Sequence, residues 1–336
     1  GAVIFVGQRS GRRFLALRTP AITLYLDTNS QASCVVSVRY ESPVLVSEPV
    51  WRIAEDRLRK QRSVGQSLVK GTNHSQDCPR AMSSRYPSDL TDAEWKQIKP
   101  IFDRFRFDDH DPRDLLNAVF YILKTGSQWR MLPKGFPPWQ TVYYHFRKWR
   151  RLNLLQRLCD RIRRAARVVA GRRPSPSAAV IDTQSVDTER QAGPGRGRDP
   201  NKKVKGRKRH VIVDTLGLLL AVVVHPANED DSQTAPSVLK RLLGKVPRLK
   251  VIFADSGYKG LPGGLVWRCF HWLLSVVEPE EDKAGFNPLP KRWVIERTFG
   301  WFGGYRRLIR DYERLPEMSE AVVRAAMIRL MIRRVA

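Results

Sequence analysis

The chain has 336 residues, with 60 Lys and Arg against 33 Asp and Glu, so its formal net charge is +27 at pH 7. With 42% hydrophobic and 28% charged residues, the composition excludes a wholly disordered chain. Such a basic protein favours a polyanionic partner, most often nucleic acid, because Lys and Arg neutralise phosphates. The longest apolar run, residues 216–224, is shorter than the roughly 20 residues that cross a bilayer. We therefore expect no membrane partner and a cytoplasmic location.

Residues 1–81 show no sustained helical or strand periodicity, and Ser, Thr, Gln and Arg separate their short apolar runs. We leave them as an unassigned N-terminal extension with two open interpretations. One is a small regulatory or DNA-binding segment, and the other is translated sequence upstream of a start at Met82. We favour the second interpretation, because a clear helix start follows at residues 88–95.

Residues 82–170 predict a helical domain. Ser88 or Thr91 can cap a first helix, and the apolar spacing predicts a second over 112–125 and a third over 139–155. Three short helices ending in a basic one are typical of a helix-turn-helix-like DNA-binding domain, although a bundle with a solvated basic face has the same pattern. On the third helix, the candidate DNA contacts are Gln140, Tyr144, Arg147, Lys148 and Arg150.

Residues 171–177 predict a linker, and residues 178–336 predict a second domain of α/β class. Strands are expected at 178–181, 209–214, 218–225, 251–254 and 273–277. Helices are expected over 231–243, 292–308 and 318–335. This order predicts a mixed sheet with helices packed against it.

Two of these strands end in an acid, Asp182 and Asp255, and a third acid, Glu296, lies in the helical segment from residue 292. The ends of neighbouring strands can meet at one crevice. Three carboxylates in a basic protein suggest Mg²⁺ or Mn²⁺, and two such ions can clamp an in-line displacement at phosphorus. The ordinary alternative is that each Asp caps a turn and the Glu pairs with Arg or Lys.

Several long stretches carry a family resemblance: residues 86–95 (YPSDLTDAEW), 126–134 (GSQWRMLPK), 139–149 (WQTVYYHFRKW), 202–210 (KKVKGRKRH), 254–260 (ADSGYKG) and 292–301 (RWVIERTFGW). From about residue 86 to its end, the chain resembles a bacterial insertion-sequence transposase of the insertion-sequence-five group, in the DDE superfamily. The resemblance implies a ribonuclease H-like mixed-sheet catalytic domain preceded by an all-α DNA-binding domain. By motif it assigns Asp182, Asp255 and Glu296 as the catalytic and metal-binding acids.

The resemblance also implies an activity and its partners. It implies binding to the terminal inverted repeats of an element and to target DNA. It also implies cleavage and strand transfer that depend on Mg²⁺ or Mn²⁺, with two ions per site. It further implies a homo-oligomer in the bacterial cytoplasm, associated with the nucleoid.

One motif departs from the superfamily pattern Tyr-x2-Arg-x3-Glu-x6-Lys around the third acid. Arg292 fits the Arg, whereas Leu289 and Gly303 occupy the Tyr and Lys positions, which makes Arg306 and Arg307 candidate DNA contacts in place of the Lys. A basic run over 196–209 also predicts phosphate contacts, at Lys202, Lys203, Lys205, Arg207, Lys208 and Arg209.

Two other functions remain open. One is a catalytically inactive, decayed or domesticated copy that only binds DNA, which the N-terminal extension and the irregular, Gly-rich residues 261–271 favour. The intact acids Asp182, Asp255 and Glu296 argue against it. The other is a ribonuclease H-like nuclease without strand transfer.

Overall fold

The computed structural model describes residues 86–105, 110–189, 193–277 and 292–336, together with the backbone of four strands within residues 3–40. The chain divides into two compact units, Gly1–Pro79 and Arg80–Ala336. Each unit is described by itself.

The first unit contains an antiparallel meander in which neighbours in sequence are neighbours in the sheet. Its strands are β1 (Val3–Arg9), β2 (Arg12–Thr19), β3 (Ile22–Asp27) and β4 (Val36–Tyr40). The sequence leaves this region unassigned, and the structure places four strands in it. Each strand is too short to reveal its periodicity alone, and the sheet is defined by hydrogen bonds between strands. The proposed start at Met82 lies outside the described residues, so the two interpretations of residues 1–81 stay open.

The second unit begins with four α-helices and a 3₁₀ turn: α2 (Asp92–Phe102), α3 (Pro112–Thr125), η1 (Trp129–Met131), α4 (Trp139–Arg151) and α5 (Leu154–Val169). Thr91 caps α2 and forms a capping box with Glu94, which confirms the predicted start. The helix predicted over 139–155 is instead two helices, because Asn153 has a left-handed backbone (φ 53°) that ends the first before α5.

A mixed sheet follows, with strand order β10-β9-β5-β7-β6 and with β8 paired to the rest of β7. Its strands are β5 (Ala178–Asp187), β6 (Gly197–Arg198), β7 (Lys205–Asp214), β8 (Leu219–Pro226), β9 (Val251–Ala254) and β10 (Leu273–Val276). The pairs β5–β7 and β7–β8 are antiparallel, whereas β9 runs parallel to both β5 and β10. This mixed order is consistent with the ribonuclease H-like domain that the sequence predicts.

The connecting elements are α6 (Asp231–Lys240), η2 (Ser256–Tyr258), α7 (Gly263–Phe270), α8 (Arg292–Gly303), α9 (Arg306–Ile309) and α10 (Pro316–Ile332). Two predictions need correction here. The helix predicted over 292–308 is interrupted between α8 and α9, and the irregular residues 261–271 contain a regular helix, α7.

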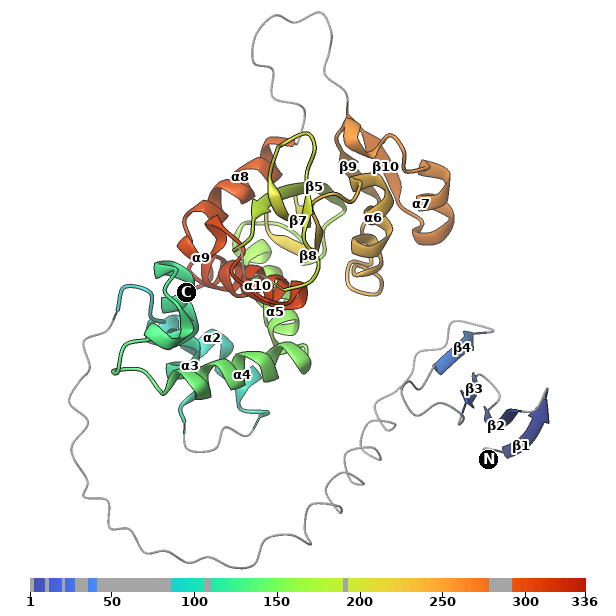
Figure 1. Ribbon diagram of the computed structural model, residues 1–336, viewed down its shortest axis with the longest axis horizontal. Helices are drawn as coiled ribbons and strands as arrows, with labels where there is room; N and C mark the ends of the chain where they lie inside the picture. Colours follow the sequence, from blue (N-terminus) through green and yellow to red (C-terminus); the bar gives the residue numbers. More distant parts are fainter. Residues whose placement is uncertain are drawn as a thin grey trace, which may run out of the picture. The chain divides into compact units, whose positions relative to one another are not determined.

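Helices cover both faces of the sheet (Figure 1). Side chains alternate along a strand, so Val180 packs in the cluster with α5, α8 and α10. Its neighbours Ala179 and Ile181 pack in the cluster with α6 and α7. Both faces are therefore buried, which explains why β7 and β8 have almost no exposed position.

The helical part and the sheet share one hydrophobic cluster. Leu158 of α5, Met327 of α10 and Val222 of β8 all belong to it. Residues 171–177, the predicted linker, consequently join two parts of one compact unit, whereas the sequence predicts two separate domains. Within the part of the chain that the structure describes, no helix is both long and apolar enough to cross a membrane.

Candidate active site

Asp182 occupies the middle of β5, on the central strand of the sheet. Its carboxylate accepts a hydrogen bond from the backbone N–H of Thr183 at 2.6 Å. Burial and the nearby Asp255 raise the pKa of Asp182 to about 7. Near pH 7 the carboxyl of Asp182 is therefore only partly ionised.

Asp255 follows directly after β9, the parallel neighbour of β5, as the sequence predicts. It caps the short η2 turn by accepting from the N–H of Gly257 at 3.0 Å. Because β5 and β9 run in the same direction, Asp182 and Asp255 line one small pocket, together with Arg292 from the start of α8.

Glu296 lies one turn further along α8 and does not line this pocket. Arg292 connects it to the pocket, because its guanidinium lies 3.6 Å from Asp255 Oδ2 and 3.2 Å from Glu296 Oε1. The structure thus brings Asp182 and Asp255 together directly, and Glu296 through an arginine. Among the described residues, no three His, Cys, Asp or Glu side chains form a ready-made metal site.

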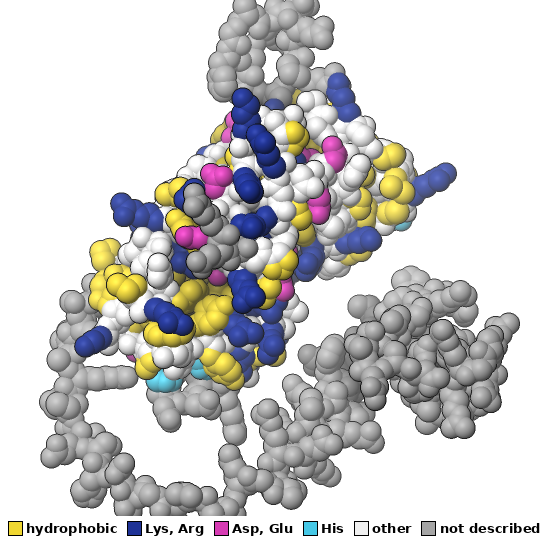
Figure 2. Space-filling model, viewed as in Figure 1, with side chains coloured by type: hydrophobic (Ala, Val, Ile, Leu, Met, Phe, Trp, Pro, Cys, Tyr) yellow, Lys and Arg dark blue, Asp and Glu magenta, His cyan; other side chains and the backbone are white. Residues whose placement is uncertain are grey.

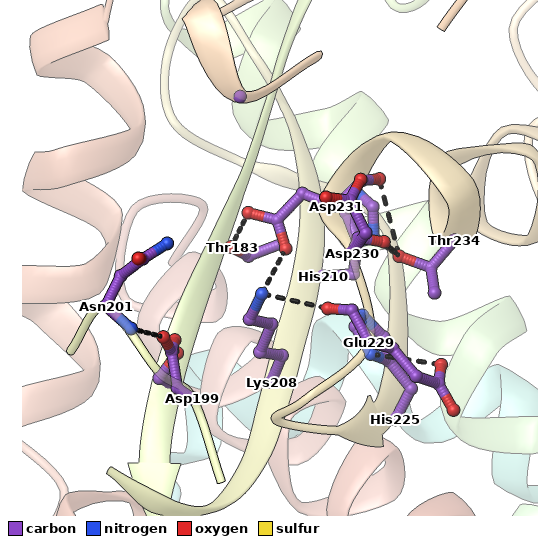
Figure 3. A network of polar contacts seen from close by, with 12 residues as sticks. Thr183, Asp199, Asn201, Lys208, His210, His225, Glu229, Asp230, Asp231 and Thr234 are labelled. Carbon is purple, nitrogen blue, oxygen red and sulfur yellow. Dashed lines mark hydrogen bonds and ion pairs between the residues drawn. The ribbon is translucent and has the colours of Figure 1, made fainter. Parts of the chain in front are cut away.

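A polar network that the sequence did not predict lies beside Asp182. Asp231, at the start of α6, accepts from the Thr183 hydroxyl and from Lys208 Nζ, both at 2.8 Å (Figure 3). The same ammonium donates to the carbonyl of Glu229 at 2.9 Å. Asp231 is therefore a further acid near the site, and the sequence places it only at the start of a predicted helix.

A buried histidine connects this network to the Asp255 turn. His210 of β7 hydrogen-bonds through Nε2 to the hydroxyl of Tyr258 at 2.8 Å and through Nδ1 to Thr234 at 3.2 Å. Burial lowers the pKa of His210 to about 3, so the ring is neutral. Its contacts tie β7, α6 and η2 together.

The structure contradicts the predicted DNA contacts of Arg207 and Arg209 on β7. Arg207 is 0% exposed and pairs with Asp311 at 3.1 Å, and it also donates to four backbone carbonyls. Arg209 is 1% exposed and donates to the Leu308 carbonyl at 2.7 Å. Both side chains lie on the face covered by the C-terminal helices, so neither can reach DNA.

Two further basic predictions are also corrected. Arg307 is buried, and two of its nitrogens pair with Glu313 at 2.7 and 3.0 Å. Lys208 is nearly buried, and Asp231 and the Glu229 carbonyl hold its ammonium. These charges stabilise the fold or the acid site and are not free on the surface.

The other basic candidates are accessible. Lys202, Lys203, Lys205 and Arg306 are exposed. Asp199 anchors the loop of Lys202 and Lys203 by accepting from Ser185 and from two backbone N–H groups (Figure 3). Lys202 in turn reaches the carbonyl of Thr183 at 3.4 Å, next to Asp182.

Helix α4 also presents accessible candidates. Gln140, Tyr144 and Arg147 are exposed along one face, whereas Lys148 and Arg150 are half-buried. Lys and Arg side chains are spread over the helical part and the sheet part in Figure 2.

Comparison with known proteins identifies the family of the chain. Residues 173–331 match the family model described as "Transposase DDE domain", and residues 90–159 match "Putative transposase of IS4/5 family". The protein is thus an enzyme that acts on DNA. Together the two matches span most of the second unit, and the chain belongs to the DDE transposases of insertion sequences.

A curated relative agrees with this family. The chain is 28% identical over 147 residues to the "Putative transposase for insertion sequence element IS402" of Burkholderia cepacia, across 41% of this chain and 69% of the relative. No solved structure matches the chain.

Proposed function

We propose that the protein binds the terminal inverted repeats of its element and catalyses metal-dependent DNA cleavage and strand transfer at Asp182, Asp255 and Glu296. The observation that carries this proposal is the pocket in which carboxylates from two parallel strands meet, with Arg292 reaching from there to Glu296. DDE transposases move DNA segments, so the remaining question is which residues of this chain do the chemistry.

The donor set fits a hard divalent cation. It consists of carboxylate oxygens, which Mg²⁺ and Mn²⁺ prefer, and the pKa of Asp182, raised by burial and then by the negative charge of Asp255, is one that a bound cation would lower. Asp182, Asp255 and Glu296 would hold one or two such ions, whose chemistry is to polarise a phosphodiester and activate the attacking oxygen. Arg292 now occupies part of the space between two of these acids.

The chain's own residues perform the positioning. The Thr183 N–H fixes the carboxylate of Asp182, and the η2 turn fixes that of Asp255. Lys202, on a loop anchored by Asp199, supplies positive charge beside Asp182 for an incoming phosphate. Helix α4 offers Gln140, Tyr144 and Arg147 to the DNA that the enzyme recognises.

The test is Asp182→Asn, assayed with Mg²⁺ on a supercoiled plasmid that carries the DNA flanking the coding region. The variant keeps the shape of the side chain and removes its charge, so we expect cleavage to fall at least about 100-fold, since metal-stabilised charge is worth several kcal/mol. DNA binding should persist. Asp187→Asn, an exposed position at the end of the same strand, is the matched control and should cut like the parent.

The products distinguish the alternative functions. Joined products, in which element ends are linked to target DNA, support strand transfer. Cuts without joined products would support a nuclease, and binding without divalent-dependent cuts would support an inactive copy. Equal cleavage by Asp182→Asn and the parent would overturn the assignment of Asp182.

A further inference from the structure

A second pocket, of about 820 Å³, lies apart from the acids. One side comes from η1 and the first turns of α4, with Trp129, Trp139 and Tyr143. The other side comes from the segment between α9 and α10, with Tyr312 and Arg314. Its volume lies within the range of about 300–1,000 Å³ that small-molecule sites occupy. None of Asp182, Asp255 and Glu296 lines it.

The inner wall of this pocket is fixed by a buried arginine. Arg307 is held by Glu313, and its guanidinium also faces two rings, with the Trp129 ring centre at 5.9 Å and the Tyr312 ring centre at 5.2 Å. It further donates to the Ser127 carbonyl at 3.0 Å. The two sides of the pocket are therefore held together before any ligand arrives, which lowers the entropic cost of binding.

A close backbone contact reinforces this wall. Gly126 has a φ of +73°, and a Cβ there would lie 2.9 Å from Arg306 Cβ, so only glycine lets α3 approach α9 this closely. The end of α3 and the start of α9 thus pack directly against each other behind the pocket.

The outer part of the pocket carries exposed cations, Arg130 and Arg314. Arg130 is exposed and lies over the Trp139 ring at 5.3 Å. Tyr312 and Arg314 are also exposed. Arg130 is held mainly by this one contact with the ring. Another flat group can therefore displace its guanidinium from the face of Trp139, and the guanidinium can then pair with an anion beside the ring.

We infer that this aromatic–arginine pocket binds an unpaired nucleotide of the DNA substrate. Aromatic side chains stack on the flat face of a base, and this face is accessible only where the base has left the duplex stack. Arg130 and Arg314 would pair with the flanking phosphates, and Glu189 in the lining can accept from an exocyclic amine. Base edges in an intact duplex could not use the rings in this way.

The position of the pocket agrees with this ligand. Trp139 and Tyr143 belong to α4, the helix whose exposed face carries Gln140 and Arg147. Glu189 follows the strand that carries Asp182, and at about 3.3 Å per residue the two lie no more than about 23 Å apart. One DNA segment can therefore reach both sites. The inference rests on the proposed function in one respect, that DNA is the substrate.

The test compares two fluorescent probes in EDTA: a short blunt duplex, and the same duplex with a few unpaired thymidines at its 3′ end. We expect the full chain to bind the second probe more tightly. Trp139→Ala should weaken that binding about 5- to 150-fold, the effect of losing one stacked base, and should change binding of the blunt duplex less than about twofold. Tyr312→Ala, at an exposed position, should lower it in the same selective way, and Trp139→Phe should retain most of it.

Trp267→Ala is the matched control, because Trp267 is 56% exposed on α7 and does not line the pocket. Equal binding of both probes by the parent, or equal losses on both probes in Trp139→Ala and Tyr312→Ala, would overturn the inference. The outcome is separate from the cleavage assay, since EDTA prevents cleavage. A preference for the unpaired probe without divalent-dependent cutting would reject the proposed cleavage activity and support the nucleotide-binding pocket. Cutting without the preference would support the cleavage activity and reject the nucleotide-binding pocket.

Discussion

Strand β7 and helix α4 are both basic in sequence, yet the fold uses their charges in opposite ways. On β7, Arg207 and Arg209 are buried and bonded within the protein. On α4, Arg147 is exposed and available to a ligand. The difference shows that a run of basic residues indicates DNA contact only when the element that carries it keeps one face in solvent.

The geometry of the two elements explains the contrast. A strand with helices on both faces has no solvent face, so each successive side chain is buried on one side or the other. Arg207 and Arg209 point to the C-terminal helices, whereas Lys208 and His210 point to α6. A helix at the edge of a core buries only one stripe, and on α4 this stripe contains Val142, Phe146 and Trp149, so Arg147 remains outside.

The largest expected effect is on stability, at Arg207. Arg207→Met keeps much of the side-chain volume but leaves Asp311 without its buried partner, which should lower the free energy of unfolding by about 3–5 kcal/mol. Urea unfolding, followed by circular dichroism, measures this change. Lys205→Met, an exposed position on the same strand, is the control and should change it by less than about 0.5 kcal/mol. If the Arg207→Met protein were as stable as the parent and had lost only DNA binding, Arg207 would be a DNA contact, as the sequence predicts.

A smaller loss is expected at Arg209, because it has no carboxylate partner within hydrogen-bonding distance among the described residues. Burial lowers the pKa of Arg209 to about 10, which reflects the cost of its desolvation. Arg209→Met leaves the Leu308 carbonyl without its donor, and we expect a loss of about 1–3 kcal/mol in the same unfolding experiment. If Arg209→Met proved more destabilising than Arg207→Met, the buried ion pair would not be the main difference between the two positions.

The positions of the acids were easier to predict than those of the bases. Asp182 and Asp255 were placed at one crevice because strand ends in an open sheet converge, and the structure brings them together. Both acids could be found from local pattern alone, since each follows a short run of apolar residues, although β5 continues past Asp182 to Asp187 and only Asp255 lies at the end of its strand. Glu296 was predicted as the third acid, and the structure connects it to the other two only through Arg292.

The rest of the site depends on contacts between distant parts of the chain. Asp231 reaches Thr183 and Lys208, and Tyr258 reaches His210, only after α6 and η2 fold against the sheet. A buried neutral histidine and a surface histidine look alike in sequence. The shared core of α5, α10 and β8 is likewise invisible to periodicity, which identifies elements but does not say which of them pack together.

The smallest expected effect belongs to the exposed helix and is an effect on binding alone. Arg147→Ala removes a charge on the solvent face of α4, and its ring contact with Tyr143, at 5.9 Å, is a weak surface interaction. Stability should change by less than about 0.5 kcal/mol, because no buried group loses a partner. If Arg147 contacts a phosphate, affinity for duplex DNA should fall about tenfold at low salt. The slope of log affinity against log salt should decrease by about 1, because one fewer counterion is released.

Anisotropy titrations over a salt series measure both the affinity and the salt slope. Arg161→Ala, at an exposed position on the neighbouring helix α5, tests whether any surface arginine has the same effect. An unchanged slope in Arg147→Ala would mean that α4 is a solvated basic face and that the loop of Lys202 and Lys203 holds the DNA without it.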